Sequence, residues 1–312
     1  MNKKGMAFIL TVSLLTVVLL IIFLSHNSFQ YQNIQRVESS MIYAMNDFIK
    51  DVNSDMGRVI KIGGYRAFIA MEDYVAATGS FFSDTDSVMA EVLSNGTVQG
   101  VSAILMNDSS LDAYFTSVNE IMNLRGVVVD YEVKEVNLSH INPWNVNFDV
   151  LINIIVVDIQ DTASWNYTKE FSSIINIKGL RDPLYSVKTE NRVPNIVREQ
   201  NQSFEDLQVL EDHIEQGYYI ASTKAPSFLQ RFENNLSNHE YGIESIVYLR
   251  DLFDQDIPIY LDRIKVDYMY FNELTGNKVC DFDMVSEDLY LVLTDDRIED
   301  YGLQDTNHST NC

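Results

Sequence analysis

The spacing of apolar and polar residues changes along the chain. Residues 6–24 form one apolar run that contains no charged residue, glycine or proline. Between residues 31 and 59, apolar side chains recur every three or four positions, which predicts an amphipathic helix. We therefore expect the helix of the apolar run to continue as a stalk helix over residues 25–63. The pair Gly63-Gly64 is expected to end it.

The apolar run over residues 6–24 predicts a transmembrane helix. Its 19 residues cover about 28 Å as a helix, close to the roughly 30 Å hydrocarbon core of a bilayer. A cleaved signal peptide would have a shorter core and a small-residue cleavage site, which residues 23–27 do not offer. Lys3 and Lys4 favour an N-terminus inside the cell. These features predict a single-pass cell-membrane protein, with residues 1–5 as a cytoplasmic leader, the lipid bilayer as partner of residues 6–24, and a C-terminal ectodomain outside.

Shorter elements are expected after the stalk. Helical spacing predicts helices over residues 65–78, 87–93 and 111–124. Alternating apolar and polar residues predict strands over residues 127–133, 146–156 and 165–177. We interpret residues 64–180 as a first ectodomain region, in which a helical segment and an antiparallel β-meander pack on the stalk.

A second α+β region is expected over residues 181–312. A helix is predicted near 204–216 with Ser203 as its N-cap. Another is predicted to begin at Pro226, and alternation over 264–270 indicates a strand. The predicted fold class is therefore α+β throughout the part that follows the long helix.

The net charge of the chain limits the kinds of binding partner that are expected. The net charge is −23, with 45 acidic and 22 basic residues. Nucleic-acid binding and docking on anionic lipid both need clustered Lys and Arg, so neither is expected. Hydrophobic residues make up 46% of the chain, enough for a packed core.

No catalytic motif is present in the sequence. There is no H-E-x-x-H, no G-x-S-x-G and no phosphate-binding glycine loop, and the five histidines are scattered. Close carboxylates could bind Ca²⁺ or form a glycosidase pair, but none matches the twelve-residue Ca²⁺ loop, and solvated surface is favoured. These carboxylates are Asp84 and Asp86, Asp251, Asp254 and Asp256, Asp281 and Asp283, and Asp295 and Asp296. We expect no enzyme activity, no cofactor, and no catalytic or metal-binding residue.

Asn-x-Ser/Thr sequons are frequent in this chain. They begin at Asn95, Asn107, Asn137, Asn166, Asn201, Asn235 and Asn307. All lie on the side predicted to be outside, so N-glycosylation of these residues is a hypothesis. The asparagine-rich composition is the alternative explanation for their number.

The two cysteines allow one disulfide bond. Cys280 and Cys312 would close a loop whose chain-entropy contribution is about 3–4 kcal/mol, and the bond would fix a polar tail. Two unpaired thiols are the alternative, and the sequence leaves both open.

The N-terminus carries a family resemblance. Lys3-Lys4-Gly5-Met6 before the apolar run resembles the class III signal of type IV pilins and archaeal pilin-like proteins. The resemblance implies cleavage between Gly5 and Met6 and a long helical spine. Leu10 stands where bacterial pilins carry Glu. This difference weakens the resemblance to bacterial pilins more than the resemblance to archaeal pilin-like proteins.

Four later segments resemble uncharacterised surface proteins of small-genome, DPANN-type archaea. They lie within residues 140–275 and are Asn142-Pro143-Trp144, residues 179–185, residues 226–229 and residues 241–245. Together with the N-terminus, this resemblance implies a pilin-like, membrane-anchored extracellular protein with a structural or adhesive role, and a candidate filament subunit that self-associates through its stalk. A solitary tethered binding module, either an adhesin or a solute-binding ectodomain, is the alternative. An exported hydrolase is less favoured, and the sequence does not identify a surface ligand.

Overall fold

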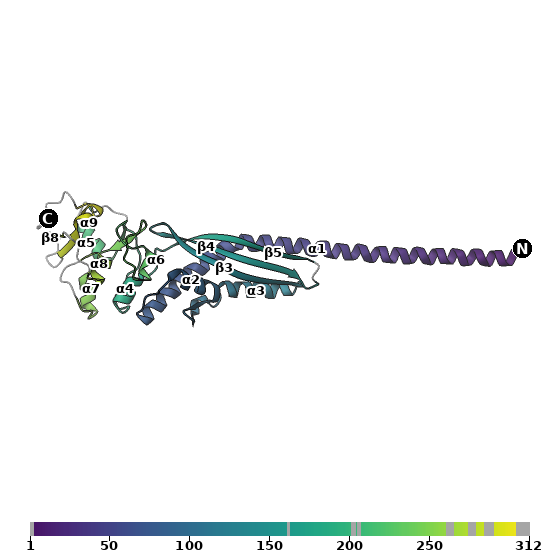
Figure 1. Cartoon of the computed structure of the whole chain (residues 1–312), viewed down its shortest axis with the longest axis horizontal. Coiled ribbons are helices and arrows are strands. Elements are labelled where there is room, and N and C mark those ends of the chain that lie inside the picture. The colour runs from purple at the N-terminus through teal and green to yellow at the C-terminus, as the bar shows by residue number, and fades with distance from the viewer. Residues whose placement is uncertain are drawn as a thin grey trace.

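A long helix and a mixed α+β body make up the molecule (Figure 1). The computed structural model describes residues 3–160, 163–200, 204, 207–259, 265–273, 279–283 and 290–303. Side chains within helices and strands are described from residue 12, except for 27–40, 207, 279–283, 290, 295–296 and 299. Helix α1 spans Lys3–Thr78, and its N-terminal part projects away from everything else (Figure 1).

The elements after α1 form two groups along the chain. The first comprises α2 (Thr85–Asn95), β1 (Thr97–Val98), β2 (Val101–Ser102), η1 (Ile104–Met106), α3 (Leu111–Asn123), β3 (Val127–Asn142), β4 (Asn145–Asp158) and β5 (Ser164–Asn176). The second comprises α4 (Pro183–Lys188), α5 (Leu207–Glu215), β6 (Tyr219–Ala221), α6 (Phe228–Arg231), β7 (Ile243–Ser245), α7 (Leu249–Asp254), α8 (Asp267–Phe271), β8 (Val279–Asp283), β9 (Tyr290–Thr294) and α9 (Asp295–Asp300). The predicted α+β class is confirmed.

Strands β3, β4 and β5 form the antiparallel meander predicted from the alternating pattern. Every second residue of β4 is buried, from Val146 to Val156, as one-sided burial of a sheet requires. Phe148 on this face meets Phe68 of α1. Tyr131, paired with Ile154 on the same face, stacks on Phe115 of α3. Helices α1 and α3 therefore cover the same face of the sheet.

The C-terminal part of α1 supplies one side of this core. Met45, Val52, Met56 and Ile60 are at most 3% exposed, as the predicted amphipathic stripe requires. Phe48 packs partly buried against the same cluster. This part of the stripe therefore packs within its own chain, and α1 is free of the body only toward its N-terminus.

The prediction that Gly63 and Gly64 end the long helix is wrong. Helix α1 continues to Thr78 and includes the helix expected over 65–78. Both glycines are buried, and a Cβ atom at Gly63 would lie 2.8 Å from the Ser109 carbonyl oxygen. Neighbouring elements approach the backbone of α1 too closely for a side chain. The glycines are thus required by close packing rather than by a helix end.

Glycine-to-alanine substitutions in α1 provide a test of this packing. A Cβ atom at Gly64 would lie 2.9 Å from the Phe148 ring and would also collide with Ile175, whereas at Gly57 the nearest atom is 3.9 Å away. We expect Gly64→Ala to lower the free energy of unfolding by about 1–3 kcal/mol through overpacking. The matched control Gly57→Ala should raise it by about 0.5–1 kcal/mol through helix propensity. Urea unfolding followed by circular dichroism measures both, and equal stabilisation by the two substitutions would contradict the close approach.

Within the part of the chain that the structure describes, no helical stretch is both long enough and apolar enough to cross a bilayer. The apolar run has described side chains over residues 12–26, which cover about 22 Å of helix, against a hydrocarbon core of roughly 30 Å. The side chains of residues 6–11 lie outside the described set. The prediction of a transmembrane helix over 6–24 is corrected by this finding. The single-pass topology, the signal anchor and the cell-membrane localisation are corrected with it.

Some predicted elements of the second group differ in the structure. The segment predicted as a strand over 264–270 contains α8, in which the Tyr270 amide donates a hydrogen bond to the Val266 carbonyl oxygen and closes a helical turn. Helix α6 begins at Phe228 rather than at Pro226, since Ser227 and Gln230 form a capping box. The helix expected over 204–216 is confirmed as α5, and Ser203 lies outside the described residues.

The two groups of elements share side-chain packing. Phe68 of α1 lies 5.6 Å from Phe228 and 6.3 Å from Phe232, measured between ring centroids. The Phe82 amide donates a hydrogen bond to the Phe232 carbonyl. Aromatic side chains of α6 and the residue after it therefore extend the core of the first group into the second.

Candidate functional site

A buried ion cluster lies at the centre of the second group. The Arg231 Nη1 atom lies 2.6 Å from Asp182 Oδ2 and 2.8 Å from Asp267 Oδ2, and all three side chains are fully buried. Asp182 is the N-cap of α4, Arg231 ends α6, and Asp267 begins α8. One guanidinium thus joins the ends of three short helices.

Hydroxyl groups add hydrogen bonds to the two carboxylates of this cluster. Tyr219 Oη donates to Asp182 Oδ2 at 2.7 Å, and Ser245 Oγ donates to Asp267 Oδ2 at 3.0 Å. Burial raises the pKa of Asp182, and the nearby Arg231 opposes that rise. Because the three charged side chains are closed to solvent, the cluster can fix the geometry of its surroundings but cannot meet a substrate.

A second buried ion pair lies nearby. Arg297 Nε lies 3.2 Å from Glu244 Oε2, and both side chains are almost fully buried. Burial raises the pKa of Glu244 to about 7, although Arg297 acts in the opposite direction. Glu244 precedes Ser245 on β7, so the two ion systems are fixed by the same short strand.

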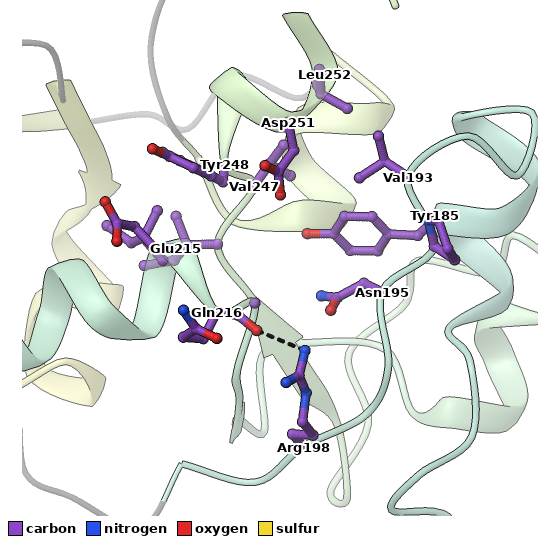
Figure 2. A pocket seen from close by; sticks show the side chains of 14 residues that line it. Tyr185, Val193, Asn195, Arg198, Glu215, Gln216, Val247, Tyr248, Asp251 and Leu252 are labelled. Atoms are coloured by element: carbon purple, nitrogen blue, oxygen red, sulfur yellow. Dashed lines mark hydrogen bonds between the residues drawn. The ribbon is translucent and has the colours of Figure 1, made fainter. Parts of the chain in front are cut away.

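An open cavity of about 130 Å³ lies beside the ion cluster (Figure 2). Tyr185 belongs to its wall, and its hydroxyl oxygen lies 3.1 Å from Ser245 Oγ, which connects the cavity to the Asp267 side of the cluster. The apolar lining consists of Val193, Pro194, Ile214, Ile246, Val247 and Leu252. The cavity therefore has both apolar and polar walls, and one of its wall residues is connected to the ion cluster.

Polar residues from separate elements line this cavity. Glu215 ends α5, Asp251 lies on α7, and Asn195 lies between α4 and α5 (Figure 2). Arg198 also lines the cavity, and its Nη2 atom donates to the Gln216 carbonyl oxygen at 3.0 Å. Burial raises the pKa of Asp251, and the negative charges of Asp254 and Glu215 raise it further.

The projecting part of α1 presents a surface of another kind. Its apolar side chains from Val12 to Leu24 are between 45% and 65% exposed. They occupy every position from 12 to 24 except Ser13 and Thr16, so they point to all sides of the helix. Within the described chain, this is the longest run of exposed large apolar side chains.

No family model, curated protein or solved structure matches this chain.

The predicted glycosylation residues are placed apart from the cavity. The described asparagines of these sequons are all exposed, at Asn95, Asn107, Asn137, Asn166 and Asn235. Asn201 and Asn307 lie outside the described residues. Exposure is a requirement for glycan attachment, and glycosylation stays a prediction.

The other predicted sites have no described side chains. Gly5 and Met6 lie within α1, but their side chains are outside the described set. Cys280 lies on β8, likewise without a described side chain, and Cys312 is outside the described residues. Leader cleavage and the disulfide bond therefore stay predictions.

The ion cluster and the cavity were not predicted from the sequence patterns. Asp251 is exposed, as expected of solvated surface, and it also lines the open cavity together with Glu215. One signal for the cluster was present in the sequence, since Arg231 directly precedes Phe232 in the segment where a helix was predicted to begin at Pro226. A charged residue on a buried helix requires partners of opposite charge.

Proposed function

We propose that this chain is a pilin-like structural subunit that self-associates through the N-terminal part of α1. The observation that carries the proposal is the exposed apolar surface from Val12 to Leu24 on a helix that continues into the α+β body. A helix that is apolar on all sides is normally buried. Copies of the same helix packed side by side would bury it, and each copy would display its body at the outside.

Burial of this surface would stabilise an assembly strongly. Each Leu, Ile or Phe side chain that is fully buried contributes about 1.5–3 kcal/mol. The described stretch carries eleven large apolar side chains, Val12, Leu14, Leu15, Val17, Val18, Leu19, Leu20, Ile21, Ile22, Phe23 and Leu24. Even partial burial therefore exceeds the typical cost of association, about 4–15 kcal/mol.

The distribution of charge supports a second copy as the occupant of this surface. Residues 6–24 carry no charge, so identical helices can pack without unpaired charges between them. The bodies carry the acidic excess and repel one another, and the projecting helix keeps them away from the packed segment (Figure 1). An assembly in which the projecting helices pack together and the acidic bodies stay apart would bury the apolar surface and limit the repulsion between bodies.

Charge substitutions on the projecting helix test the proposal. Leu19 and Phe23 are one helical turn apart and are exposed, so Leu19→Glu with Phe23→Glu should leave the body folded. We expect the full-length protein to form high-mass, regular particles in sedimentation and negative-stain microscopy. The double variant should sediment as a monomer.

The matched control is Ile121→Glu with Leu124→Glu, two exposed apolar residues on α3 and directly after it. It removes the same kind of surface and adds the same charge away from α1. We expect the control to assemble like the unmodified chain. A monomeric unmodified chain, or a Leu19/Phe23 variant that assembles equally well, would exclude self-association through this segment and favour a solitary binding module.

A further inference from the structure

Two histidines face one another where the two groups of elements meet. His140 lies on β3 and pairs with Val146 of β4, whose side chain is on the buried face of the sheet. His239 lies between α6 and β7, in the second group. The centroids of the two imidazole rings are 5.6 Å apart, and the ring planes are tilted by 59°. The two rings thus form a side-chain contact between the end of the sheet and the second group.

The His140 ring is buried without hydrogen-bond partners. Both of its nitrogens are closed to solvent, and neither forms a hydrogen bond within the described chain. A charged imidazolium has two N–H groups that need acceptors or water, so this environment favours the neutral ring. Burial lowers the pKa of His140 to about 4 and His239 lowers it further, while the Asn142 backbone acts in the opposite direction.

Hydrogen bonds fix His239 in a tight turn over residues 239–242. The His239 amide donates to the Ala225 carbonyl oxygen, and the His239 carbonyl oxygen accepts from the Gly242 amide. The ring atom Nδ1 accepts a hydrogen bond from the Tyr241 amide at 3.0 Å. An imidazolium cannot accept a hydrogen bond, so this bond exists only while the ring is neutral. The turn therefore holds a neutral His239 ring against His140.

We propose that the His140–His239 contact is an acid-sensitive connection, which holds the turn over residues 239–242 on the end of the sheet only while both rings are neutral. A proton taken up by either ring places a positive charge where no acceptor is ready for it. Release of the turn brings the His140 ring into water, which solvates that charge. The inference does not depend on self-association through α1, because neither histidine lies on that helix.

The surroundings of the contact offer little to offset a positive charge. The residue opposite His140 on β4 is Val146, which is apolar. The turn itself carries Glu240, which is exposed, and Tyr241, whose ring centroid lies 6.0 Å from that of His239. Within the described chain, no carboxylate contributes to the pKa of His140. The proton therefore remains uncompensated as long as the turn is in place.

Release of the turn should occur in mildly acidic solution. His140 binds a proton less tightly in the closed form than in the released form, so the released form gains stability as pH falls. The gain begins near the ordinary histidine pKa of about 6.5 and is complete near the closed-form pKa of about 4. The Phe68–Phe228 contact between the two groups carries no titratable side chain, so we expect release to stay local to the turn.

Hydrogen exchange of the full-length chain at pH 7 and pH 5, followed by mass spectrometry and corrected for intrinsic exchange rates, tests the proposal. We expect the opening equilibrium constant of the amides over residues 239–242 to rise about twentyfold at pH 5. The Phe82 amide, bonded to the Phe232 carbonyl oxygen elsewhere in the junction, should change less than about threefold. His140→Phe should leave a rise of at most about fivefold at residues 239–242, because phenylalanine has no titratable group.

His26→Gln is the matched control, because His26 is exposed on α1, N-terminal to the described core residues. It removes one imidazole away from the contact and should retain the full rise. His140→Leu should behave like His140→Phe, and circular dichroism at pH 7 verifies that each variant is folded. An equal rise in the unmodified chain and the His140 variants would overturn the proposal. An equal rise at Phe82 and at residues 239–242 in the unmodified chain would overturn it without any variant.

Discussion

Replacement of Arg231 by leucine should lower the free energy of unfolding by about 3–5 kcal/mol. The substitution removes the guanidinium that lies within 3 Å of two buried carboxylates, Asp182 and Asp267. Both carboxylates then remain in a fully buried site without a positive charge. Tyr219 and Ser245 still donate hydrogen bonds, but hydroxyl groups cannot offset two negative charges. Urea unfolding at pH 7 measures the loss.

The exposed pair Lys50–Asp47 on α1 provides the control for this experiment. Lys50→Leu also removes one positive charge, yet surface pairs contribute at most about 1 kcal/mol, so stability should change little. Addition of Asp182→Asn and Asp267→Asn to Arg231→Leu should restore part of the loss, because it removes the uncompensated charges. If Arg231→Leu alone were as stable as Lys50→Leu, the stabilising role of the ion cluster would be contradicted.

The loss of stability caused by Arg231→Leu should also depend on pH. Burial raises the pKa of Asp182 above its ordinary value, and removal of Arg231 takes away the group that opposes this rise. The folded variant therefore binds protons more tightly than the unfolded chain. Its stability falls as pH rises above the unfolded pKa of about 3.9. We expect the difference in the free energy of unfolding between this variant and the unmodified chain to decrease from pH 7 to pH 4.

Phe68→Ala should lower the free energy of unfolding by about 3–5 kcal/mol, the usual range for a buried phenylalanine. The Phe68 ring lies 5.4 Å from Phe148 of β4 and 5.6 Å from Phe228 of α6, between ring centroids. One side chain of α1 thus contacts both the sheet and the second group of elements. Removal of the ring leaves a cavity where α1, the sheet and the second group of elements meet.

Phe253→Ala is the matched control, because that ring is 70% exposed on α7. The same chemical change there should alter stability by no more than about 0.5 kcal/mol. Urea midpoints of the two variants give the comparison. Similar midpoints would show that Phe68 is not central to the core.

The sheet could be predicted from sequence because its signal is local. Alternation along β4 places Phe148 and Val150 on one face whatever the tertiary context, and the short turn at Pro143-Trp144 fixes antiparallel pairing. The helix end at Gly63-Gly64 was predicted wrongly for a reason that is not local. Glycine both breaks helices and permits close approach, and only the positions of Ser109 and Phe148 decide between the two.

The ion cluster and the cavity depend on contacts between distant segments. Asp182, Arg231 and Asp267 are far apart in sequence, and no local pattern shows that the three side chains meet. Asp251 belongs to a run of acidic residues that local reasoning assigns to solvent. That it lines the same cavity as Glu215 depends on the positions of α5 and α7, which no local pattern gives.

The direction of α1 relative to the sheet determines how the molecule would bear a mechanical load. Strands β3 to β5 run roughly along α1, and the second group of elements lies at the end far from the projecting helix (Figure 1). A pull between the projecting helix and that group acts parallel to the interface between α1 and the sheet. The side chains from Met45 to Val75 would then have to slip together, in shear, rather than separate one after another. This geometry resists tension along the long axis better than tension across it.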